Sequence, residues 1–210
     1  MSPRRRQRDA WRRHGSTTRV PKTEITGLYG ALLKRMTRRM LGSVPEAAEV
    51  MWHHPAIFKD MMGFGRKAEK WDRLDRGLGT LAAMAAAGVV GCSFCLDLHY
   101  FMAHDKGLDE AKARQVPRWR ESDAFTGLER RVMEYAEAMS QTPPAVTDEM
   151  SAALLEELGP AGLLELTARV ATMNLTARAN VALGIRSQEF SAACGLPPLA
   201  TPSARMALPA

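Results

Sequence analysis

Residues 91–116 read GCSFCLDLHYFMAHDKGLDEAKARQV and contain a CxxCxxxH motif. The flanking sequence predicts a helix that begins at Cys92 and is ended by Gly107. Successive residues of an α-helix are about 100° apart, so Cys95 lies about 60° and His99 about 20° from Cys92 around the axis. The spacing therefore places two thiols and one imidazole on the same face of one helix.

The positions of these side chains favour redox chemistry. Cys92 stands at the start of the predicted helix, where unpaired backbone N–H groups and the positive end of the helix dipole stabilise a thiolate. His99 follows Cys95 by one turn and can accept the proton of its thiol. We therefore predict reversible dithiol and disulfide chemistry at Cys92 and Cys95.

Three other interpretations of the cysteines are open from the residues alone. Cysteines are often small, buried apolar residues, and a CxxC pair can contribute to a zinc site if a remote ligand such as His53 completes it. One short helix cannot supply a tetrahedral ligand set, so we predict no metal ion. A thioredoxin-like motif requires a βαβ setting, which the sequence lacks.

Residues 77–96 form an uncharged run that overlaps the motif and is long enough to suggest a membrane span. The run is rich in Ala and Gly, and Gly91 divides it. Small residues allow neighbouring helices to approach closely. We therefore expect two helices packed in the middle of a soluble protein and no contact with a membrane.

The rest of the chain also favours helices. It has 22 Leu and 13 Met but only 10 Val and 3 Ile, a balance that disfavours sheets. We expect an all-α fold in one main domain. The predicted helices cover residues 24–41, the stretch from Pro45 to before Trp52, residues 56–70, a segment capped by Asp72 and ended by Gly91, the stretch from Thr126 to Gln141, residues 148–159 and residues 160–183. In the last of these, a buried face is predicted by the apolar stripe of Leu163, Leu166, Val170, Met173, Ala177 and Val181.

The net charge of +6 comes from the beginning of the chain. Residues 1–22 carry eight basic residues and one acidic residue, whereas residues 23–210 carry 21 basic and 22 acidic residues. We expect residues 1–22 to be a disordered tail, residues 23–190 to form the all-α domain, and the Pro- and Ala-rich residues 191–210 to be a loose tail. The basic tail lacks an apolar segment after its arginines, which predicts a cytoplasmic protein.

The stretch GCSFCLDLHYFMAHDKGLDEAKARQV resembles the signature of the carboxymuconolactone decarboxylase superfamily, in its alkylhydroperoxidase D-like branch. The resemblance covers most of residues 23–190. It implies an alkylhydroperoxidase D-like helical bundle that assembles as a homo-oligomer and reduces peroxides or a partner's disulfide with electrons from a thiol donor. By this resemblance, Cys92 and Cys95 match the redox pair and His99 the proton-relay histidine.

Two positions depart from the family pattern. The relay glutamate usually stands twelve residues before the first Cys, where this chain has Thr80, and the histidine often found between the cysteines is replaced by Phe94. A threonine hydroxyl can hold a water but cannot act as a carboxylate base, so we expect weak peroxidase activity. The other acidic residues considered are Asp97, pointing away from the thiols, and the more distant Asp72, Asp75 and Glu69.

We therefore expect a thiol-dependent oxidoreductase with Cys92, Cys95 and His99 as catalytic residues. The candidate pocket residues are Thr80, Phe94 and His53. The sequence contains no nucleotide-binding motif, and we expect no cofactor. Two alternatives are a carboxymuconolactone-decarboxylase-like lyase that uses His99 as acid and base, and a non-enzymatic redox sensor or interaction protein. In the second alternative, the basic tail binds nucleic acid or an acidic partner.

Overall fold

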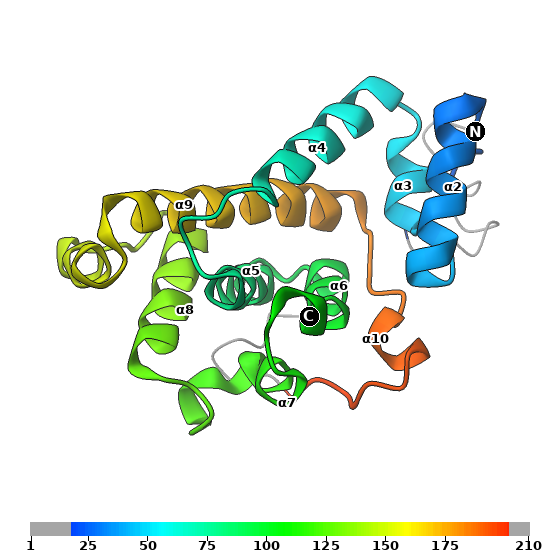
Figure 1. Ribbon diagram of the computed structural model, residues 1–210. Coiled ribbons are helices and arrows are strands. Elements are labelled where there is room, and N and C mark those ends of the chain that lie inside the picture. The colour runs from blue at the N-terminus through cyan, green and yellow to red at the C-terminus, as the bar shows by residue number, and fades with distance from the viewer. Residues whose placement is uncertain (1–17, 202–210) are drawn as a thin grey trace, which may run out of the picture.

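The computed structural model describes residues 18–201, so the part of the predicted disordered tail before residue 18 lies outside this range. Residues 18–22, the end of that tail, are packed on the fold instead, because the Arg19 N–H donates to the Leu183 carbonyl at 2.7 Å and Lys22 pairs with Glu46 at 2.7 Å. Within residues 18–201 the chain forms helices and no strand, which confirms the predicted fold class (Figure 1). The helices are α2 (Gly27–Leu41), α3 (Glu46–Met51), α4 (Pro55–Ala68), α5 (Arg76–Val90), α6 (Ser93–Phe101), α7 (Glu110–Arg114), α8 (Gly127–Ser140), α9 (Asp148–Leu183) and α10 (Phe190–Ala193), with the short 3₁₀ helices η1 (His104–Lys106) and η2 (Val116–Glu121).

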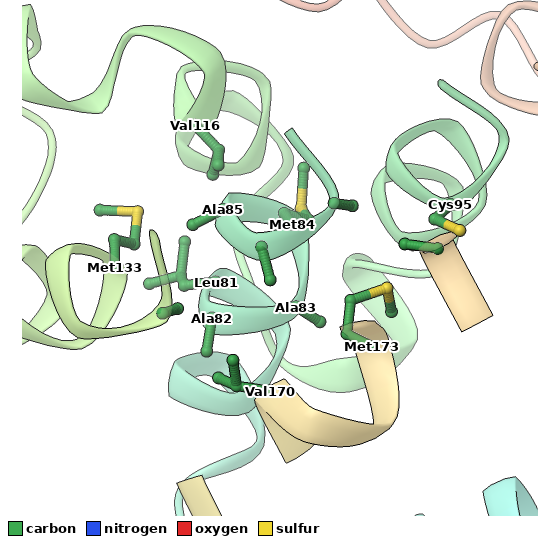
Figure 2. Close-up of a cluster of buried hydrophobic side chains, with 14 of the residues drawn as sticks. Leu81, Ala82, Ala83, Met84, Ala85, Cys95, Val116, Met133, Val170 and Met173 are labelled. Atoms are coloured by element: carbon green, nitrogen blue, oxygen red, sulfur yellow. The ribbon is translucent and has the colours of Figure 1, made fainter. Parts of the chain in front are cut away.

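Helix α5 is the centre of the bundle, and α6, α8 and α9 pack around it (Figure 1). Every residue from Leu81 to Ala87 is at most 6% exposed. Figure 2 shows side chains of α5 surrounded by Val116, Met133 and Val170 from the neighbouring elements. The small side chains of α5 allow these neighbours to approach closely, as the uncharged run predicts.

No helix among the described residues combines the length and the apolar character that a membrane span requires.

Gly91 ends α5 and sets the start of α6. Its φ of 79° lies in the left-handed region, which glycine adopts without a steric penalty. Cys92 is then the N-cap of α6, and its Sγ accepts a hydrogen bond from the Cys95 N–H at 3.2 Å. The CxxC pair therefore lies at a helix N-terminus, as predicted. Helix α6 is shorter than predicted, because it ends at Phe101 and the chain to Lys106 turns into η1.

Local sequence signals set several other boundaries correctly. Thr126 and Glu129 form the predicted capping box of α8. Gly159, with a φ of 68°, breaks α9 where the sequence predicts a division into two helices. One boundary differs from the prediction: helix α2 begins at Gly27 and not at residue 24, because the backbone of Thr26 is still extended.

The start of α5 differs from the prediction because of a contact from α9. Glu165 accepts hydrogen bonds from the backbone N–H groups of Arg73 (2.7 Å) and Leu74 (3.2 Å), which satisfies these groups outside a helix. The N-cap is therefore Asp75, whose Oδ1 accepts the Leu78 N–H at 3.0 Å, and not Asp72.

The described part of the C-terminal segment is packed, in contrast to the loose tail predicted after residue 190. The buried carboxylate of Asp97 on α6 accepts hydrogen bonds from the backbone N–H groups of Phe190 (2.9 Å) and Ser191 (3.2 Å). It also accepts the hydroxyls of Ser187 (2.8 Å) and Ser191 (2.6 Å). Further along, the hydroxyl of Tyr100 donates to the Pro197 carbonyl at 2.9 Å. The segment is thus fixed to α6 by hydrogen bonds to Asp97 and Tyr100.

We expect replacement of Asp97 by Ala to lower the free energy of unfolding by about 2–4 kcal/mol, because several donors would lose a charged acceptor. Urea unfolding measures this change. Asp123→Asn, at an exposed site, is the control and should change stability little. A loss below about 0.5 kcal/mol for Asp97→Ala would show that the segment is not held by this carboxylate.

Candidate functional site

Cys92 and Cys95 are joined by a disulfide, with their Cα atoms 5.3 Å apart. Both residues are buried, at 1% and 4% exposure. Asn180 of α9 lies against the pair, with its Nδ2 3.4 Å from the Sγ of Cys95 and 3.9 Å from the Sγ of Cys92. The structure therefore brings the two sulfurs together and gives them a polar neighbour.

A cavity of about 460 Å³ lies between α4, α5, α6, η1 and α9, and neither Cys92 nor Cys95 is among its lining residues. His99 lines it one turn after Cys95 on α6, and Thr176 lines it one turn before Asn180 on α9. On each helix, the residue that lines the cavity and the residue at the sulfurs are thus four positions apart, about 6 Å along the axis. Figure 2 shows Met173, another lining residue, between Ala83 and Cys95.

The three predicted pocket residues differ in their positions. Thr80 lines the cavity, and its hydroxyl donates to the Arg76 carbonyl at 2.9 Å. Phe94 does not line it, because its ring packs on Phe190 of the C-terminal segment, with centroids 6.1 Å apart. His53 does not line it either, because its Nε2 lies 2.9 Å from the carbonyl oxygen of Pro21 at the N-terminal end of the fold.

His99 is held in its neutral form. The pKa of its imidazole is lowered from 6.5 to about 4, mainly by burial and to a smaller extent by the positive charge of Lys106. The negative charge of Glu69 acts in the opposite direction. Its Nδ1 is buried and has no hydrogen-bond partner among the described residues. A buried nitrogen without a partner costs stability, and a role in catalysis is one reason why a protein keeps such a group. His99 is therefore available as a proton acceptor at neutral pH.

Glu69 supplies a carboxylate to the same cavity. Burial alone would raise its pKa, but the hydrogen bond and charge of Lys106 and the nearby His99 and Arg169 lower the pKa below its ordinary value. The Nζ of Lys106 lies 2.7 Å from the Glu69 Oε1. The residue comes from the end of α4, far from the motif in sequence. No pattern in the sequence predicts that Glu69 and His99 line the same cavity, and the sequence analysis considers Glu69 only as a distant acid.

Arg169 forms a fixed part of the cavity wall. Its Nε donates to Glu165 Oε1 at 2.8 Å and its Nη2 to the Trp71 carbonyl at 3.1 Å. A Cβ at Gly79 would lie 3.1 Å from the Arg169 Cδ, so the absence of a side chain there makes room for the guanidinium arm.

Within the range 18–201, no group of three or more His, Cys, Asp or Glu side chains is placed to hold a metal ion.

Comparison with known proteins places this geometry in a family. The model of the carboxymuconolactone decarboxylase family matches residues 55–138, a stretch that includes the motif and most of the cavity. The uncharacterized protein YnjA of Escherichia coli (strain K12) is 34% identical over 152 residues, which are 72% of this chain and 84% of that protein. The chain belongs to the carboxymuconolactone decarboxylase family.

Solved structures show the same fold. The alkylhydroperoxidase AhpD core of an uncharacterized peroxidase-related protein from Ralstonia eutropha JMP134 has a TM-score of 0.73 at 19% identity, and covers 83% of this chain and 95% of that chain. The debrominase Bmp8, in the complex of its C82A variant with 2,3,4-tribromopyrrole, has a TM-score of 0.71 at 18% identity, and covers 84% and 96%. The same fold thus carries different chemistries.

We expect the pKa of His99 to respond in opposite directions to its two charged neighbours. Lys106→Met should raise the pKa above about 4, and Glu69→Gln should lower it further, because the lysine opposes and the glutamate favours the imidazolium. NMR titration of the imidazole signals measures both changes. Lys112→Met, whose lysine pairs with Glu129 outside the cavity, is the matched control. A His99 midpoint near 6.5 in the unmodified protein would contradict the burial of the imidazole.

Proposed function

We propose that this protein is a thiol-dependent oxidoreductase that reduces peroxides or a partner's disulfide by cycling Cys92 and Cys95 between dithiol and disulfide. The observation that carries the proposal is the disulfide at the N-terminus of α6, one turn from a neutral histidine that lines a cavity. Family membership and the alkylhydroperoxidase-like fold support the same class of chemistry. A cytoplasmic location stays a prediction.

In the reduced protein, Cys95 is the better placed nucleophile, because His99 follows it by one turn on the cavity side. His99 takes the thiol proton, and the thiolate attacks an oxygen of the hydroperoxide. The O–O bond breaks, the alkoxide leaves as an alcohol after taking a proton, and Cys95 becomes a sulfenic acid. Cys92 then attacks the Cys95 sulfur, which releases water and forms the disulfide. An external dithiol returns the two electrons.

Glu69 and Lys106 tune the proton transfer. The imidazolium that forms when His99 takes a proton is favoured by the charge of Glu69 and disfavoured by that of Lys106. Thr80, at the position of the family's relay glutamate, has no charge to offer. Glu69 therefore provides from α4 the carboxylate that α5 lacks, although its ion pair with Lys106 weakens its effect.

We expect one equivalent of hydrogen peroxide to convert the reduced protein to a form with one Cys92–Cys95 disulfide, seen in mass spectrometry as the loss of two hydrogen atoms. Cys194→Ser, which removes the exposed free thiol, is the control and should behave in the same way. Cys92→Ser should stop at a Cys95 sulfenic acid that reacts with dimedone. A protein that keeps both thiols free after this treatment contradicts the proposal. Turnover of a carboxylated lactone by a variant with both cysteines replaced by Ser would favour a lyase instead.

His99→Gln should slow oxidation of the reduced protein by peroxide at pH 7 by roughly 100-fold or more, the usual size of a general-base contribution, because glutamine cannot take the thiol proton. Stopped-flow measurement of thiol loss gives both rates. Cys194→Ser, which removes the exposed free thiol, is the matched control and should oxidise at the wild-type rate. An unchanged rate in His99→Gln would remove His99 from the reaction.

A further inference from the structure

The side-chain amide of Asn180 lies against both sulfurs of the candidate site. The residue belongs to the last turns of α9 and is 7% exposed. Its Nδ2 is 3.4 Å from the Sγ of Cys95 and 3.9 Å from the Sγ of Cys92. Because the sulfurs of a disulfide have no proton to donate, the amide faces them with its N–H group. Asn180 is therefore a hydrogen-bond donor to the redox pair.

This buried donor has only sulfur as its acceptor. Among residues 18–201, the Asn180 Nδ2 has no hydrogen-bond partner other than the two Sγ atoms. Burial of an amide N–H is costly unless it meets a good acceptor, and a neutral sulfur is a weak one. A thiolate is a stronger acceptor, because its negative charge strengthens the hydrogen bond. The amide is thus matched to an ionised, reduced cysteine better than to the disulfide.

The end of α9 is held in place, and Asn180 with it. The Asn180 carbonyl accepts the Ile185 N–H at 2.9 Å, where the chain leaves the helix. The guanidinium of Arg19 donates to the carbonyls of Val181 (2.8 Å) and Ala182 (2.7 Å). These contacts fix the backbone on both sides of the amide. The donor is therefore in position before any charge develops on the sulfur.

The two sulfurs have different donors. The Sγ of Cys92 accepts the backbone N–H of Cys95 at 3.2 Å, because Cys92 is the N-cap of α6. The Sγ of Cys95 receives no backbone N–H from the described residues, and its one hydrogen-bond donor among them is the Asn180 amide. Loss of this amide would therefore affect Cys95 more than Cys92.

The charged neighbours do not replace this hydrogen bond. His99 is neutral, because burial and Lys106 lower the pKa of its imidazole. The charge of Lys106 is offset by Glu69, whose Oε1 lies 2.7 Å from its Nζ. Arg169 of the cavity wall is likewise held in an ion pair. The neutral donor from α9 is therefore the group best placed to stabilise an anion on Cys95.

We propose that Asn180 is a catalytic residue, which stabilises the Cys95 thiolate of the reduced protein through its Nδ2–H group. The proposal rests on the dithiol and disulfide cycle proposed above. His99 takes the proton of the thiol, and Asn180 binds the negative charge that stays on the sulfur. The hydrogen bond weakens again when Cys95 attacks the substrate, because its sulfur is then neutral.

Ionisation of a single thiol tests this role. In the full chain with Cys92→Ser and Cys194→Ser, Cys95 is the only cysteine left, and the ultraviolet absorbance of the thiolate reports its titration. Asn180→Leu in this background should raise the pKa of the Cys95 thiol by about 1–2 pH units, the size expected for a hydrogen bond to a charged group. Asn180→Asp should raise it as well, because a carboxylate places a negative charge beside the sulfur.

Two controls separate this role from a structural one. Asn174→Leu removes the same amide group from α9 at a site where the Nδ2 donates to Ser140 at 2.8 Å, and it should leave the pKa of Cys95 unchanged. In the matched protein that keeps only Cys92, Asn180→Leu should raise the thiol pKa much less, because the backbone donor remains.

A Cys95 pKa that is the same with and without the Asn180 amide would overturn the proposal, and so would an equal rise in Asn174→Leu. Far-UV circular dichroism verifies the fold, and Asn180→Asp, which keeps the shape of asparagine, provides the test if the leucine variant does not fold. Failure of the oxidoreductase proposal is seen separately, as a wild type that keeps both thiols free after peroxide treatment. A wild type that forms the disulfide, together with a Cys95 pKa that ignores Asn180, would remove only the role of Asn180.

Discussion

The close packing around α5 is the constraint on which the rest of the molecule depends. Its buried stretch from Leu81 to Ala87 consists mainly of alanine, so α6, α8 and α9 can all reach its backbone. Gly91 then reverses the chain without strain and delivers Cys92 to the start of α6. The position of Cys92 and Cys95 therefore depends on small residues, the alanines of α5 and Gly91, whose side chains take no part in the reaction.

Much of the fold follows from local patterns, and what they miss lies in contacts between distant segments. The Thr126 capping box and the Gly91 and Gly159 breaks are encoded within a few residues, and the structure agrees with them. The packing of the C-terminal segment depends on Asp97, about 90 residues away, and composition alone indicates a loose tail. Likewise, the start of α5 moves because Glu165 binds the preceding backbone from α9.

The candidate site shows the same division. The spacing of Cys92, Cys95 and His99 is sufficient to place them on one helix, but not to show which other groups surround them. Glu69 lines the cavity because the end of α4 reaches the same cavity as His99 of α6, an arrangement of helices that no local motif encodes. The predicted apolar stripe of α9 ends at Val181, but this residue is 37% exposed, and Asn180 is buried against the sulfurs instead. The sequence prediction therefore missed Asn180, and the only indication in the sequence is a polar residue beside the end of the stripe.

Two neighbouring positions of α5 affect the cavity in different ways. A Cβ at Gly79 would lie 3.1 Å from the Arg169 Cδ, so a larger residue there would displace an arm that Glu165 and the Trp71 carbonyl hold in place. Thr80, the next residue, lines the same cavity, and its short side chain hydrogen bonds to its own helix. A substitution at position 79 would therefore change the shape of the cavity, whereas one at position 80 would change the chemical groups in its wall.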